Sequence, residues 1–201
     1  MSRCVVYTVL ALVPACQGAA ATSTPTGAAP RTDVPTAIEV RGPSGMVDAR
    51  ITGDRPCRAS VDGRELIVGS QPFVAMLGNN RYAGTDIDGS TVLTRDDEAF
   101  ARIFPAVPSS DEVALFDAQG VAFIRATFDR AARTVTVRDK GGSPIRELRQ
   151  TAQAITFSSA TGDTTVTGTP DLLLAAVLTA TEASPEVRAL AACHRLQKAV
   201  P

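Results

Sequence analysis

From residue 37 onward, short runs of β-prone residues alternate with turn signals. Cys57–Val61 and Glu65–Val68, for example, flank Asp62-Gly63, a dipeptide typical of two-residue hairpins because glycine tolerates positive φ. Similar runs separated by Gly, Asp and Asn continue as far as Thr167. The pattern predicts a succession of antiparallel β-hairpins.

Two regions interrupt this pattern with helical signals. Asp96-Asp97-Glu98 precedes Ala99–Phe104, and acidic residues suit a helix N-terminus, so we expect a short central helix that ends at Pro105. Near the C-terminus, Thr169-Pro170-Asp171 can start a helix over the apolar run Leu172–Leu178. We expect this run to be a core helix packed on a sheet.

A second C-terminal helix starts at Ser184-Pro185-Glu186 by the same capping logic. Within it Ala189, Cys193, Leu196 and Val200 recur on one face, which places Cys193 on the buried side.

Together these elements predict an α+β fold: a meander of antiparallel β-hairpins with a short central helix and a C-terminal helical pair. We expect residues 37–201 to form a single domain. The segment 105–110 (PAVPSS) has the composition of a hinge, so a division into two β halves at that point stays open.

The N-terminus has the features of an export signal. Met1–Arg3 carries one positive charge and Cys4–Val13 is apolar. Ten helical residues span roughly 15 Å against a hydrocarbon core of about 30 Å, which fits a signal peptide and not a membrane-spanning helix.

Val13-Pro14-Ala15-Cys16 resembles the lipobox of bacterial lipoproteins, in which an aliphatic, a variable and a small residue precede a cysteine. The resemblance implies a signal peptide over residues 1–15 and a diacylated Cys16 as the mature N-terminus. Gln17 in place of Asp implies sorting to the outer membrane. The alternative is ordinary secretory cleavage near Ala19-Ala20-Ala21, which would give a secreted protein without a lipid.

Residues 17–36 contain mostly Ala, Thr, Ser, Pro and Gly. Such a segment cannot build a core, so residues 16–36 are interpreted as the lipidated cysteine followed by a flexible tether.

Either cleavage leaves two cysteines in the mature chain, Cys57 and Cys193. Because an exported protein meets an oxidising compartment, we predict a disulfide between them. Two buried free thiols are the alternative.

Composition narrows the range of ligands. Twenty Lys and Arg residues oppose 21 Asp and Glu, which leaves no basic excess for binding nucleic acid. Arginines nevertheless gather in the second half of the chain. If Arg125, Arg138, Arg146 and Arg149 share an open face, they could bind an anionic envelope polymer by bidentate contacts. The alternative is a solvated face balanced by nearby acidic residues such as Glu147.

The sequence contains no recognisable catalytic motif. His194 is the only histidine, and we expect it to serve packing or the helix dipole. No residue is predicted to be catalytic, to bind a metal or to hold a cofactor. We therefore expect an envelope lipoprotein whose domain is not an enzyme and binds a protein or glycan, or has a structural role. A hydrolase using two carboxylates is the alternative.

Overall fold

A computed structural model of the chain describes residues 37–53, 55–107, 111–159 and 161–199. The signal peptide, Cys16 and the tether expected over residues 1–36 lie outside the described residues. The strands are β1 (Ile38–Arg41), β2 (Val47–Thr52), β3 (Cys57–Val61), β4 (Arg64–Val68), β5 (Val74–Leu77), β6 (Asn80–Ile87), β7 (Ser90–Arg95), β8 (Glu98–Phe104), β9 (Glu112–Asp117), β10 (Ala122–Asp129), β11 (Thr134–Arg138), β12 (Pro144–Gln150), β13 (Ile155–Ser159) and β14 (Gly162–Thr167). The helices are α1 (Leu172–Leu178) and α2 (Pro185–Ala199).

These strands form one closed antiparallel barrel in which each pairs with its neighbours in sequence. The ring is closed by β1 and β14, where Val40 lies opposite Val166. The predicted α+β fold is therefore wrong, although the predicted antiparallel meander is present. Local turn chemistry specifies each hairpin, whereas closure depends on pairing between the first and last strands, which no local pattern encodes.

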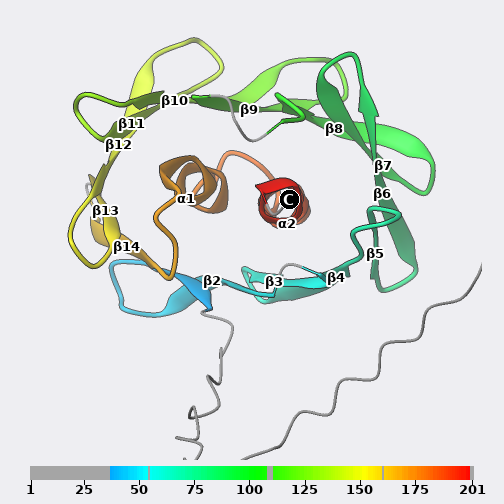
Figure 1. The fold of residues 1–201 in the computed structure, drawn as a ribbon, viewed down its shortest axis with the longest axis horizontal. Helices are drawn as coiled ribbons and strands as arrows, with labels where there is room; N and C mark the ends of the chain where they lie inside the picture. The colour runs from blue at the N-terminus through cyan, green and yellow to red at the C-terminus, as the bar shows by residue number, and fades with distance from the viewer. Residues whose placement is uncertain (1–36, 54, 108–110, 160, 200–201) are drawn as a thin grey trace, which may run out of the picture. The chain divides into compact units, whose positions relative to one another are not determined.

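The two helices lie inside the ring of strands (Figure 1). A barrel with many strands encloses more space than its own side chains can fill. Here α2 packs against β3 and β4, while α1 packs against β9–β12. Every residue of α1 is buried, and so is most of α2, because the ring of strands surrounds both helices. The prediction that Leu172–Leu178 is a core helix packed on a sheet is confirmed, although the sheet closes into a ring around it.

The predicted central helix over Ala99–Phe104 is also wrong, because these residues belong to β8. Asp96 and Asp97 adopt positive φ angles of 52° and 68° and form the turn between β7 and β8. Their acidic side chains thus mark a hairpin turn. Beyond the segment 105–110, β9 pairs directly with β8, so both halves of the chain belong to one sheet.

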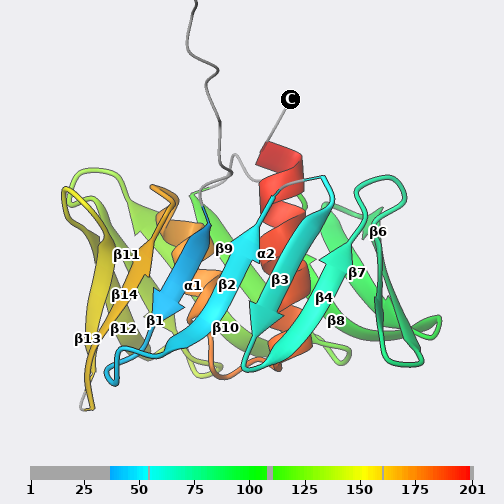
Figure 2. The ribbon, with the colours of Figure 1, turned by 90° about the horizontal axis from the view of Figure 1, so that it is seen from below.

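The two ends of the barrel differ. We call one of them the terminal end, because β1 begins there at Ile38 and α2 ends there at Ala199 (Figure 2). We call the opposite end the turn end, because residues 179–184 connect α1 to α2 there. There the buried Arg188 donates hydrogen bonds to Asp62 and to the Leu178 carbonyl oxygen. These contacts attach the helical pair to the turn between β3 and β4.

Candidate functional site

A cavity of about 640 Å³ lies at the terminal end of the barrel. Its walls come from the last turns of α2, the loop between β4 and β5, and strands β6 and β7. The side chains that matter for its chemistry are Phe73, Asp86, Thr91, His194, Gln197 and Lys198. The volume is within the range of about 300–1,000 Å³ that is usual for small-molecule sites.

A hydrogen-bonded chain connects the barrel wall to α2 in this cavity. Thr91 Oγ1 donates to Asp86 Oδ1 at 2.6 Å and lies 2.9 Å from His194 Nε2. Since a hydroxyl has one proton, the imidazole must supply the proton of the second bond. His194 is therefore protonated at Nε2, which leaves Nδ1 as an acceptor. No described residue forms a hydrogen bond to Nδ1.

The charges of this chain follow from burial and pairing. Burial lowers the pKa of His194 from 6.5 to about 4, and the attraction of Asp86 offsets this only in part. Burial raises the pKa of Asp86, but hydrogen bonds from Lys198 and Thr91 outweigh burial and hold that pKa below its usual value. At neutral pH the imidazole is thus neutral, and Asp86 forms an ion pair with Lys198 at 2.6 Å.

The ring of Phe73 forms the apolar part of the cavity wall. It packs edge-on against His194, with the ring centroids 5.6 Å apart. Gly84 makes room for it, because a Cβ atom at that position would lie 2.5 Å from Phe73 Cδ1. A larger residue at position 84 would displace the ring.

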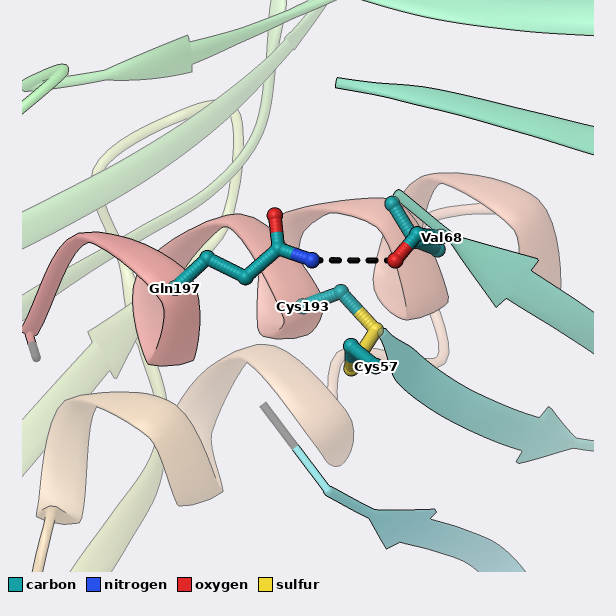
Figure 3. Close-up of a disulfide and its surroundings, with 4 residues drawn as sticks. All are labelled: Cys57, Val68, Cys193 and Gln197. Atoms are coloured by element: carbon teal, nitrogen blue, oxygen red, sulfur yellow. Dashed lines mark hydrogen bonds between the residues drawn. A yellow bond between two sulfur atoms is a disulfide. The ribbon is translucent and has the colours of Figure 1, made fainter. Parts of the chain in front are cut away.

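Gln197 is an unusual residue of the cavity lining because one of its side-chain atoms lacks a hydrogen-bond partner among the described residues. Its Nε2 donates to the Val68 carbonyl oxygen at 3.0 Å, and this contact fixes the orientation of the amide. The amide oxygen Oε1 points away from Val68 and from the neighbouring disulfide (Figure 3). It is buried, and no described residue donates to it. A buried carbonyl without a donor costs about 1–3 kcal/mol.

The disulfide predicted between Cys57 and Cys193 is present, with the two Cα atoms 5.6 Å apart. It ties the start of β3 to α2 one helical turn before Gln197 (Figure 3). Both cysteines are fully buried. The bridge thereby fixes the part of α2 that presents His194 and Gln197 to the cavity.

The four arginines predicted to share a face are separated. Arg125 and Arg138 lie directly opposite each other on the outer face of β10 and β11. Arg149 also points outward, but it pairs with Glu147 at 2.8 Å. Arg146 faces the barrel interior, where it binds Glu182 and the Thr179 carbonyl oxygen. Of the four predicted arginines, only Arg125 and Arg138 lie next to each other on one open face. Arg149 fits the alternative, in which the arginines are solvated and balanced by acidic residues.

Sequence reasoning missed the role of Gln197 and Lys198. Both follow the predicted disulfide cysteine by about one helical turn, and His194 adjoins it. The predicted bridge places this stretch of helix beside the start of β3, and this signal could have identified the α2 side of the site, although not its partners Asp86 and Thr91.

The cavity gives no support to the hydrolase alternative. Glycoside hydrolysis by carboxylates needs two of them, one kept protonated by a raised pKa. Asp86 is the only acidic residue among the described residues that line the cavity, and its pKa is lowered. Within the described part of the chain, no three His, Cys, Asp or Glu side chains are grouped to hold a metal ion.

No protein-family model, curated protein or solved structure matches this chain. Among the described residues, no helix combines the length and the apolar character needed to cross a membrane.

Proposed function

We propose that this chain is an exported, membrane-anchored lipoprotein whose barrel binds a small neutral molecule in the cavity at its terminal end. The observation that carries the binding proposal is Gln197, a residue of the cavity lining whose Oε1 atom is buried and lacks a donor among the described residues. A ligand N–H or O–H group would satisfy this atom once a side-chain shift opens it to the cavity. Binding would then remove the free-energy cost of leaving this buried acceptor without a hydrogen bond.

The remaining groups define the chemical class of the ligand. Gln197 Oε1 and His194 Nδ1 are both acceptors and lie three residues apart on α2, so they share one face of the helix. A ligand that pairs with both atoms must carry at least two hydrogen-bond donors. Asp86 and Lys198 already neutralise each other, and Arg55, the other charged residue of the described lining, donates to the Gln197 backbone carbonyl oxygen at 3.5 Å. A neutral polyol, sugar or amide therefore fits better than an ion, and Phe73 can pack against its apolar face.

Binding can be followed through the imidazole, because His194 is the only histidine in the chain. We would titrate the protein with glucose, N-acetylglucosamine and myo-inositol and record the His194 NMR signals. We expect a saturable shift with at least one of these probes. Gln197→Leu should abolish it, whereas the matched control Gln153→Leu, at an exposed position outside the cavity, should not.

Two outcomes would contradict the binding proposal. The absence of a saturable shift with all three neutral probes is the first. The second is equal binding by the Gln197→Leu protein, provided that its unfolding midpoint matches that of the parent. Tighter binding of putrescine or glucuronate than of the neutral probes would show that the ligand class is wrong.

The membrane anchor is tested separately. The lipobox-like residues support lipidation at Cys16, and the resemblance implies the outer membrane. Cys16→Ser should release the protein from the membrane fraction. Unchanged membrane association would overturn lipidation and leave the ligand proposal standing. Release of the parent protein into the medium would instead favour the secreted, non-lipidated alternative.

A further inference from the structure

A second surface lies on the outer wall of the barrel, away from the α2 cavity. It is a groove of about 480 Å³ over β8–β11. Three arginines line it, Arg102, Arg125 and Arg138, together with the rings of Phe104 and Phe116. We call it the arginine groove.

Strand register explains why these side chains meet. Phe104, Ala114, Arg125 and Arg138 stand in one row across β8–β11, each opposite the next. Residues in such a row point to the same side of the sheet. Ala114 is small and buried at 6% exposure, so it forms the floor between larger neighbours. Arg102 stands opposite Phe116 in the parallel row beside it.

The charge of the groove is unbalanced. Arg130 and Arg149, elsewhere on the barrel, pair with carboxylates at 2.8 Å. By contrast, no ion pair joins the three groove arginines to a carboxylate of the described residues. Arg125 lies over the Phe116 ring at 5.6 Å, and Arg138 donates to the Gly142 carbonyl oxygen. Glu112 is the only acidic residue among the described groove lining.

The pair Arg125 and Arg138 is unfavourable without a ligand. Like charges directly opposite each other on neighbouring strands repel. An anion placed between them would turn this repulsion into two charge-assisted contacts, for which the planar guanidinium is well suited.

We propose that the arginine groove binds an anionic polysaccharide. Arg125 and Arg138 stand on adjacent strands about 4.8 Å apart, and Arg102 stands on β8, two strands from Arg125, so the three guanidinium groups suit negative charges repeated along a chain. Phe104 and Phe116 offer flat apolar surfaces to sugar rings. An acidic peptide fits less well, because the closed barrel leaves no free strand edge to which an extended peptide could add.

The experiment compares three probes at low salt: oligogalacturonate, its neutral methyl ester and poly-L-glutamate. We expect oligogalacturonate to bind, with an affinity that falls as salt is added. The double variant Arg125→Gln/Arg138→Gln should weaken binding by more than about tenfold. The matched control Arg58→Gln removes an exposed arginine on β3 and should leave the affinity unchanged.

Any of three results would overturn the proposal: no binding of oligogalacturonate, equal binding of the methyl ester, or poly-L-glutamate binding at least as tightly. If Arg58→Gln lost as much affinity as the double variant, the polysaccharide would be held by the overall positive charge of the surface and not by the arginine groove. The double variant should unfold at a temperature no lower than that of the parent, since it removes two exposed side chains whose charges repel each other. It should also leave the His194 signals unchanged, which separates this proposal from the ligand cavity.

Discussion

Thr91 Oγ1 and His194 Nε2 lie 2.9 Å apart, and this contact joins the wall of the barrel to the helix it encloses. The two residues are separated by 103 positions in the chain. Their hydrogen bond requires a proton on Nε2, and burial keeps the imidazole neutral at neutral pH. The stability of the barrel should therefore depend on the protonation of a single residue.

The first prediction concerns acid pH. The pKa of His194 is lowered from 6.5 to about 4, so between these values the unfolded chain binds a proton that the folded chain does not. The free energy of unfolding should fall as pH drops through this window, by up to about 3 kcal/mol. Urea unfolding at several pH values measures this fall.

The control for this experiment is His194→Gln, whose stability should change less over the same window. NMR titration of the parent should give an imidazole pKa near 4. A value near 6.5 would mean that the histidine is not buried as described.

The second prediction concerns the disulfide. Cys57 and Cys193 are 136 residues apart, and in the chain-entropy treatment a loop of this length contributes about 5 kcal/mol at most. Cys57→Ala/Cys193→Ala should lower the free energy of unfolding by up to that amount, as measured in guanidinium chloride. Reduction of the parent protein should lower its unfolding midpoint in the same way. If reduction left the midpoint unchanged, the bridge would not constrain the unfolded chain.

The third prediction compares two glycines with nearly equal backbone angles. Gly168 and Gly120 have φ angles of 82° and 83°. A Cβ atom at Gly168 would lie 2.2 Å from the Ala37 carbonyl oxygen, whereas one at Gly120 would meet nothing within 4 Å. Gly120→Ala should cost about 1–2 kcal/mol from the left-handed backbone alone. Gly168→Ala should cost clearly more, and equal thermal unfolding midpoints would rule out the close approach.

Local patterns were sufficient to predict most of the strands. Asp62-Gly63 marks the β3–β4 hairpin, and both residues adopt the positive φ that this turn needs. The positions of α1 and α2 were predicted correctly, although the N-cap of α1 is Asp171 and not Thr169. The interpretation failed at β8, because acidic residues before an apolar run can introduce a helix or form a turn. That error also hid Arg102, which was assigned to a helix and so could not be placed on the outer face.

Long-range arrangement was beyond local reasoning. Whether the meander closes depends on β1 meeting β14, and the position of the helices depends on that closure. The apolar composition of α1 is consistent with packing on a sheet or inside a ring. The candidate cavity was missed for the same reason, since Thr91 and Asp86 approach His194 only when α2 lies within the barrel.

The position of α2 has a consequence for the order of assembly. In the chain, α2 follows every strand of the ring that it helps to fill, so it is synthesised after all of them. The ring cannot close around both helices until α2 has been made, so β1 must wait for β14 and α2. We expect chains truncated before Pro185 to remain sensitive to protease, and protection in pulse-labelled cells to appear only after α2 has been synthesised.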